Sequence, residues 1–234
     1  ANHFKASTAF MTLMMLICFN QIGYGYDLFL PRLLDTVAGS LIAGLAVFFI
    51  LPDWQGRRLH QTAAATLRAH GRYLQHIMQE YSQGKTDDMQ YRIARREAHN
   101  ADAALSGSLG NMLKEPGHFR RQSDLGFRFL LYSHSLLSYI SALGAHREKL
   151  ADAPNYPSLN REAEQLADNL VRLADCLENM RPVCPDCSAE EDQCHRLAGL
   201  LVGDDDHLRL LHNQLLLIGQ QLASLRKLAS EMTG

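Results

Sequence analysis

One stretch of the sequence, predicted to be helical over residues 87–114, carries a row of basic and titratable side chains. The row consists of Arg92, Arg95, Arg96, His99 and Asp102. Their spacing of i, i+3, i+4, i+7 and i+10 places them along one face of a helix. A mostly basic face suits contact with an anion or an acidic partner, and it also suits salt bridges to neighbouring helices. The sequence favours salt bridges between helices, with the anion or partner site as the functional alternative.

A second candidate group lies in a turn that is rich in cysteine. Cys184 and Cys187 form a C-x-x-C pair, and Cys194 is followed directly by His195. Thiolates and imidazoles are zinc ligands, and Cys176 in the preceding helix offers a further thiol. Adjacent side chains such as Cys194 and His195 do not easily point at the same ion. The sequence therefore favours reduced cysteines without a metal, and a zinc site or a redox-sensitive pair are the alternatives.

An ion pair is also expected in the apolar N-terminal region. Asp35 is the one charged residue between Leu33 and Leu51, and Arg32 precedes it by three positions. Residues three apart in a helix are neighbours, so the two side chains are able to pair. An ionisable residue inside a membrane span suggests a substrate or proton role by default. The position of Asp35 near the end of the span favours a salt bridge at the membrane surface instead.

The sequence carries no enzyme motif. It lacks a P-loop, a dinucleotide fingerprint, an H-E-x-x-H pair and a nucleophile elbow. The formal net charge of −2 gives no basic footprint for nucleic acid. We therefore expect a protein that is not an enzyme, uses no cofactor and binds no nucleic acid.

Two apolar stretches predict a transmembrane hairpin over residues 1–52. Residues 6–26 carry no charge and residues 33–51 carry one. Each stretch has about the ~20 residues that an α-helix needs to cross a bilayer. Basic residues, among them Lys5 and Arg57, lie at the open end of this hairpin. The positive-inside rule therefore places both chain ends in the cytoplasm.

Residues 53–234 predict a cytoplasmic α-helical bundle, because apolar residues recur at helical spacing between turns marked by glycine and proline. The expected helices cover about 54–82, 87–114, 123–149, 158–180, 188–201 and 204–231. Residues 129–146 carry no formal charge, which favours a buried core helix over a third membrane span. The predicted fold class is thus all-α, with a transmembrane hairpin followed by a helical bundle.

Several blocks of residues resemble a known family. They are residues 91–105 (YRIARREAHNADAAL), 111–119 (NMLKEPGHF), 126–130 (GFRFL) and 133–139 (SHSLLSY). The blocks resemble bacterial inner-membrane proteins of the YccS/YhfK type, within the fusaric-acid-resistance-like (FUSC, aromatic acid exporter) superfamily. Residues 18–21 and 32–39 are similar to the last two spans of the second membrane half in that family. The resemblance covers about residues 6–150.

The resemblance implies a protein with two membrane halves, each followed by a cytoplasmic helical region. This chain would be the C-terminal part of such a protein in the bacterial inner membrane. Its partners would be the lipid bilayer, the N-terminal spans of the same protein and possible further copies of itself. The implied activity is export of aromatic acids or related compounds, with the basic row near the cytoplasmic mouth. The alternative is a membrane-anchored helical scaffold that binds a partner and transports nothing.

Overall fold

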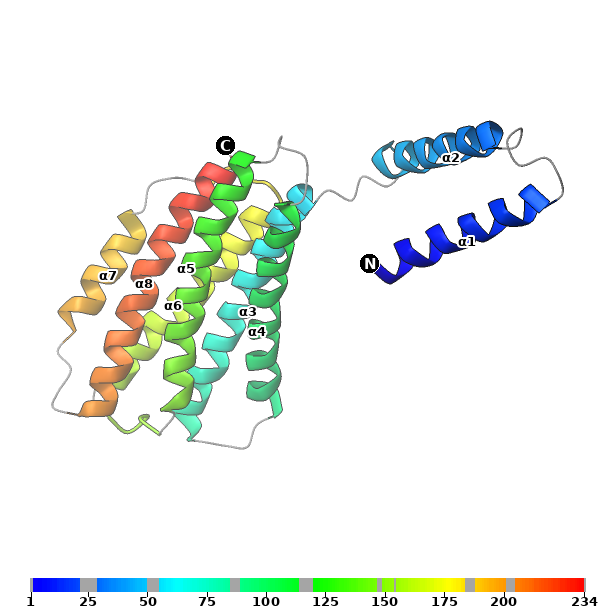
Figure 1. The fold of residues 1–234 in the computed structure, drawn as a ribbon. Coiled ribbons are helices and arrows are strands. Elements are labelled where there is room, and N and C mark those ends of the chain that lie inside the picture. The colour runs from blue at the N-terminus through cyan, green and yellow to red at the C-terminus, as the bar shows by residue number, and fades with distance from the viewer. Residues whose placement is uncertain are drawn as a thin grey trace. The chain divides into compact units, whose positions relative to one another are not determined.

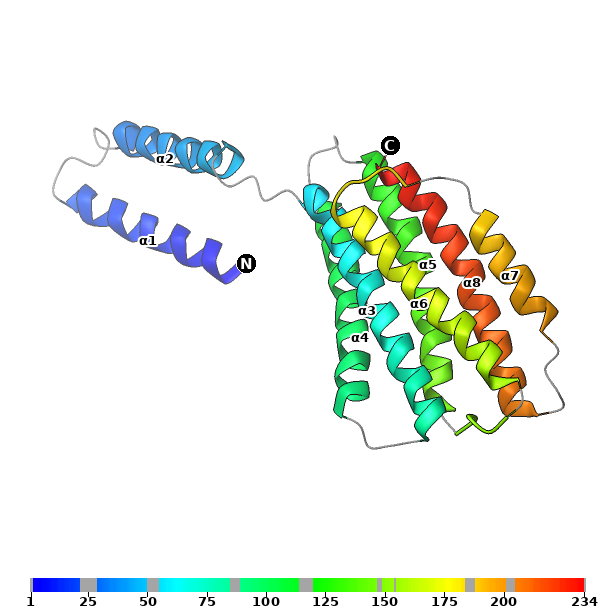
Figure 2. The same ribbon diagram turned by 180° about the vertical axis from the view of Figure 1, so that it is seen from behind.

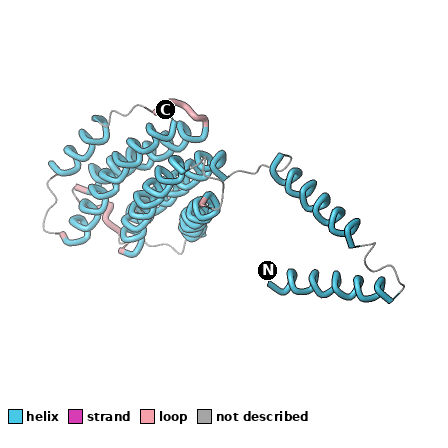
Figure 3. Tube along the Cα trace, turned by 45° about the horizontal axis from the view of Figure 1, so that its top comes forward, coloured by secondary structure: helices cyan, strands magenta, loops and turns pink. Residues whose placement is uncertain are grey.

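The structure of the chain is a computed structural model, and it consists of helices. It describes residues 2–21, 29–49, 55–84, 89–113, 120–146, 149–153, 155–183, 188–200 and 205–233. Within these residues there are eight α-helices and no strand (Figure 1, Figure 3). The all-α class that the sequence predicts is confirmed. The chain divides into two compact units, Ala1–Asp53 and Trp54–Gly234.

The first unit contains helices α1 (Asn2–Gln21) and α2 (Phe29–Phe49). They lie where the two membrane spans are predicted, within a few residues at each end. Both helices expose large apolar side chains, among them Phe10, Leu34 and Ile42. Among the described residues, no helix combines the length and the apolarity that crossing a bilayer requires. The helices are thus confirmed, and their predicted role as a transmembrane hairpin is not.

The second unit is a bundle of six helices. They are α3 (Gln55–Gln83), α4 (Met89–Met112), α5 (Arg120–Ala145), α6 (Tyr156–Glu178), α7 (Ser188–Gly199) and α8 (Asp206–Thr233). Four of them form a ring in which α3 packs on α6, α6 on α8, α8 on α5, and α5 on α3. Helix α4 lies beside α3 and α5, and α7 lies beside α8 and α6, at opposite edges of the bundle (Figure 1, Figure 2).

This arrangement divides the bundle into two halves of three consecutive helices. Within each half every helix contacts the other two: α3, α4 and α5 pack on one another, and so do α6, α7 and α8. Consecutive helices run in opposite directions, as the colour gradient shows (Figure 1). The halves join through the antiparallel pairs α3–α6 and α5–α8.

The core of the bundle follows the apolar periodicity of its helices. Phe129, Leu136 and Ile140 on α5 are fully buried, so the uncharged stretch at 129–146 is a core helix, as the sequence favours. The pair α3–α6 approaches closely at Gly71. A Cβ atom at this position would lie 3.2 Å from the Ala167 carbonyl oxygen, a distance that leaves little room for a side chain.

Buried tyrosines close one end of the bundle. The last carbonyls of a helix lack partners within the helix. At the end of α5, the Tyr81 hydroxyl donates to the Leu143 carbonyl at 3.1 Å and the Tyr91 hydroxyl donates to the Gly144 carbonyl at 3.4 Å. The Tyr73 and Tyr91 hydroxyl oxygens are 3.2 Å apart. These side chains from α3 and α4 therefore fix the C-terminal turn of α5.

Helix α7 is attached to the bundle mainly through polar groups. Its buried residues are Glu190, Gln193 and Leu197. Glu190 is 1% exposed and forms an ion pair with Arg226 of α8, whose Nε donates to Glu190 Oε1 at 2.6 Å. The Gln193 side chain donates to the Glu162 carbonyl of α6 at 3.2 Å. A carboxylate and an amide thus occupy positions at which a bundle helix usually has apolar side chains.

Candidate functional site

The basic row on α4 divides into an exposed part and a buried part. Arg92, Arg95, Arg96 and His99 are exposed, whereas Asp102 is buried. The reason is the register of α4 on its neighbours, because Tyr91, Ala94, Ala98 and Leu105 share the buried face with Asp102. The row therefore begins on the outer surface of the bundle and ends in the contact of α4 with α5.

The ion pairs of α4 in the described part of the chain involve Glu97 and Asp102 rather than the exposed residues Arg95 and Arg96. Among the described residues, Arg95 and Arg96 have no ion pair. The one exposed ion pair between α3 and α4 in the described part joins Arg72 and Glu97, whose nearest atoms are 3.9 Å apart. A pair this long and this exposed contributes little stability. Two guanidinium groups of the row are thus available to an anion or an acidic partner.

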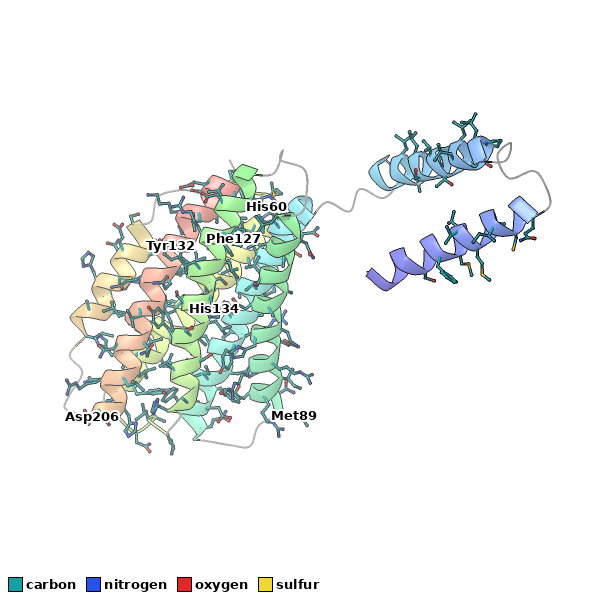
Figure 4. The ribbon with its side chains drawn as sticks, in the orientation of Figure 1. His60, Met89, Phe127, Tyr132, His134 and Asp206 are labelled. Atoms are coloured by element: carbon teal, nitrogen blue, oxygen red, sulfur yellow. The ribbon has the colours of Figure 1, made fainter. Side chains whose placement is uncertain are left out.

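Asp102 makes a short contact with a histidine of α5. Its Oδ2 is 2.9 Å from Nδ1 of His134, which projects from the middle of α5 (Figure 4). The Asp102 side chain is 11% exposed and that of His134 is 67% exposed. An ionised carboxylate only accepts hydrogen bonds, so Nδ1 carries the proton in this pair. The contact therefore joins α4 to α5 through a buried carboxylate and an exposed imidazole.

His70 of α3 completes a polar cluster with these residues. It is fully buried, and neither ring nitrogen has a hydrogen-bond partner among the described residues. Burial, followed by the charges of His99 and His134, lowers the pKa of His70 to about 3. His70 therefore stays neutral at physiological pH. We refer to His70, His99, Asp102 and His134 as the histidine cluster.

The histidine cluster contains residues from the three helices α3, α4 and α5. No group of His, Cys, Asp or Glu in the described part of the chain has the arrangement of a metal site. The cluster thus combines a buried imidazole, His70, with a buried carboxylate that is hydrogen-bonded to the exposed imidazole of His134.

Sequence reasoning does not find two members of this cluster. His70 occurs among scattered histidines on the predicted helix 54–82, and His134 occurs inside an uncharged stretch. One feature of the sequence does indicate that His70 is buried: it shares a helix face with Leu67 and Leu74, which are themselves buried. A histidine on an apolar face is expected to be buried, but its neighbours follow only from the packing of the helices.

The other predicted ionic site lies on α2. Asp35 is exposed there, and the side chain of Arg32 lies outside the described residues. The salt bridge between Arg32 and Asp35 therefore stays a prediction.

The cysteine-rich turn is described only in part. Cys184 and Cys187 lie outside the described residues. Cys194 of α7 points toward α8, where a Cβ atom at Gly219 would lie 2.9 Å from its Sγ, whereas the adjacent His195 is exposed. These two side chains thus diverge. Burial, followed by the charges of Glu190 and Glu191, raises the pKa of Cys194, which keeps it in the protonated thiol form.

Comparison with known proteins identifies bacterial relatives, one of which is an inner membrane protein by name. The chain is 36% identical to the inner membrane protein YccS of Escherichia coli over 92% of its own length and 32% of that protein. It is 44% identical over 64% of its length to an uncharacterized protein of Haemophilus influenzae, of which it covers 21%. It is 30% identical over 51% of its length to the uncharacterized protein YhfK of Escherichia coli, of which it covers 16%.

These matches confirm the resemblance to proteins of the YccS/YhfK type. The chain spans less than two thirds of the length of each of these relatives. No family model and no solved structure matches the chain.

Proposed function

We propose that this chain is the C-terminal part of a transport-type protein of the bacterial inner membrane, which exports aromatic acids or related compounds. In this proposal α1 and α2 cross the membrane as a hairpin with both chain ends in the cytoplasm. Helices α3 to α8 form the cytoplasmic region that gates or assembles the membrane part. Kinship with YccS, an inner membrane protein by name, supports the location.

The main support for the proposed membrane hairpin is the exposure of large apolar side chains on α1 and α2. The bundle buries most of its large apolar residues in a core. Helices α1 and α2 instead expose residues that a soluble protein would cover: Phe10, Met11, Leu13, Met14, Ile17, Leu30, Leu34, Val37, Leu41 and Ile42. The helices have 20 and 21 residues, which corresponds to about 30 Å of helix, the thickness of the hydrocarbon core of a bilayer.

The surface of α2 also suits contact with further helices. A Cβ atom at Gly39 or Gly44 would meet no other atom within 4 Å. Small residues at such positions let a second helix approach closely inside a membrane. In the proposal these positions face further spans of a transport path, to which this chain contributes two.

The basic row on α4 supplies the anion contact of the proposal. Aromatic acids are carboxylates near neutral pH, and arginine is the side chain best suited to bind a carboxylate through two parallel hydrogen bonds. Arg95 and Arg96 are exposed and have no ion pair among the described residues.

The topology is testable with reporter fusions. A periplasmic reporter such as alkaline phosphatase is expected to be active when fused after Leu28, between α1 and α2, and inactive when fused after Gly234. The physical reason is the gathering of basic residues at the open end of the hairpin. A cytoplasmic reporter at the same two positions is the control and should give the opposite pattern. Activity of the periplasmic reporter at Gly234 would contradict the proposed orientation.

An efflux measurement separates transport from the scaffold alternative. Cells that produce the full protein are preloaded with a radiolabelled aromatic acid such as benzoate, and its loss is followed with time. We expect faster loss than in cells without the protein, and slower loss when Arg95 and Arg96 are both changed to glutamate. Arg209→Glu, on an exposed position of α8, is the matched control and should leave the rate unchanged. Equal rates with and without the protein would favour the anchored scaffold.

A further inference from the structure

Helix α7 buries much less apolar surface than the helices on which it lies. Of its 12 residues, Glu190, Gln193 and Leu197 are buried, and only Leu197 is apolar. Helix α6, with 23 residues, buries ten, and all of these except Glu162 are apolar. Burial of apolar side chains is the main favourable contribution that holds a helix in a fold. Helix α7 is therefore attached much more weakly than its neighbours.

Polar contacts position α7 on the bundle. The Gln193 side chain accepts from Asn169 Nδ2 at 3.2 Å and donates to the Glu162 carbonyl at 3.2 Å. Arg196 Nε donates to Glu162 Oε1 at 3.3 Å. When such groups separate, water replaces the lost hydrogen bonds, so the net cost of breaking each one is small. These contacts thus fix the register of α7 without adding the stability of an apolar core.

The helices under α7 are held in place by other contacts. Helix α6 packs on α3, α8 packs on α5, and α6 and α8 pack on each other. Helix α7 lies outside this ring, at the edge of the bundle (Figure 1, Figure 2). The core of the ring therefore does not depend on α7. Segments with few buried apolar contacts open at a lower free energy than the whole fold.

We propose that α7 is a lid, which opens as a unit while the ring of α3, α5, α6 and α8 stays folded. Opening uncovers a polar strip that consists of Glu162 and Asn169 on α6 and Arg226 on α8. The ion pair of Glu190 with Arg226 is the latch of this lid. Glu190 is 1% exposed in the closed form, so its carboxylate gains water only when α7 moves away. This inference is independent of the transport proposal.

Hydrogen exchange of the full chain in mild detergent tests the lid. A helix of 12 residues is barely stable alone in water, so the amides of α7 exchange once it leaves the bundle. We expect them to exchange at least about a hundredfold faster than the amides in the middle of α6 and α8, and to depend less on urea, as in a local opening. Exchange of α7 with the rate and the urea dependence of α6 and α8 overturns the proposal.

A disulfide across the lid compares the closed and the free form of one variant. Sγ of Cys194 lies 2.9 Å from the position of a Cβ atom at Gly219 of α8, which is close enough for a disulfide with Gly219→Cys. The other four cysteines are changed to serine. Oxidation should slow the exchange of α7 at least about tenfold, because the lid is then tied to α8, and reduction should restore it. If the oxidised and the reduced form exchange at the same rate, with the disulfide verified by mass spectrometry, α7 does not open away from α8 and the proposal is wrong.

The latch is tested by Arg226→Met. Without the arginine the buried carboxylate of Glu190 has lost its partner, so we expect the amides of α7 to exchange about tenfold faster or more. Arg209→Met, which removes an exposed ion pair with Asp206 on the same helix, is the matched control and should keep the rate of the parent. An unchanged rate in Arg226→Met would contradict the role of the pair as the latch.

Discussion

Changing Arg226 to methionine is expected to lower the free energy of unfolding of the bundle by about 3–5 kcal/mol, the range found when one partner of a buried ion pair is removed. Glu190 is almost completely buried, and its Oε1 accepts from the Arg226 guanidinium. Its Oε2 has no partner among the described residues. Without the arginine, this carboxylate must lie buried and unpaired or pull α7 away from the bundle. Urea denaturation followed by circular dichroism measures the loss.

Two further variants show whether the ion pair is the cause. Adding Glu190→Leu to the methionine variant should recover most of the lost stability, because well-packed apolar residues often replace a buried ion pair without cost. Arg209→Met removes an exposed pair with Asp206 and should cost at most about 1 kcal/mol. If Arg226→Met unfolds at the same urea concentration as the parent, the pair does not hold α7 in place.

The stability of the bundle is expected to fall as the pH is lowered from about 6.5, with His70 as a principal cause. Burial lowers the pKa of His70 from 6.5 to about 3 in the folded chain. Between these two values the unfolded chain binds a proton that the folded chain does not, so unfolding becomes easier as the pH falls. The slope approaches about 1.4 kcal/mol per pH unit well below pH 6.5, and the effect disappears above it.

His70→Leu should reduce this dependence. The leucine cannot titrate, and it removes two buried ring nitrogens that lack partners among the described residues. We therefore expect the variant to be at least as stable as the parent at pH 7 and clearly more stable at pH 5. His195→Leu, at an exposed position of α7, is the control and should keep the pH dependence of the parent. His60 has its pKa lowered by burial as well, so part of the dependence should remain. An unchanged slope in His70→Leu would contradict the assignment.

The helices of the bundle follow from the sequence because local signals mark their ends. The predicted helix 54–82 is α3, Gln55–Gln83, and the predicted helix 158–180 is α6, Tyr156–Glu178. The end of α5 is less well predicted, at residue 149 instead of Ala145. There the Leu150 amide donates to the Tyr81 carbonyl at 2.9 Å, so a contact with α3 draws the chain out of the helix. Such a contact is invisible in a local pattern.

Only part of the candidate site can be predicted from the sequence, because contacts between distant residues do not appear in a local pattern. The spacing of the α4 row shows that its residues share one face, but it does not show that Asp102 is buried while Arg96 is exposed. Glu190 gives a similar case. In the sequence it lies in the first turn of the predicted helix 188–201, and in the structure it pairs with Arg226, 36 residues further along the chain. Partners this distant follow from the order in which the helices pack, which residue types alone do not determine.

The division of the bundle into two halves of three helices bears on how the chain is synthesised. Contacts within α3, α4 and α5 involve only residues that leave the ribosome before α6, so this half is able to assemble while the chain is still growing. Its partner faces remain uncovered during that interval, including the side of α3 where Gly71 later meets Ala167. Until α6 and α8 emerge, these faces are open to aggregation or to a chaperone. The period between the synthesis of α5 and that of α8 is therefore the vulnerable stage in the production of this protein.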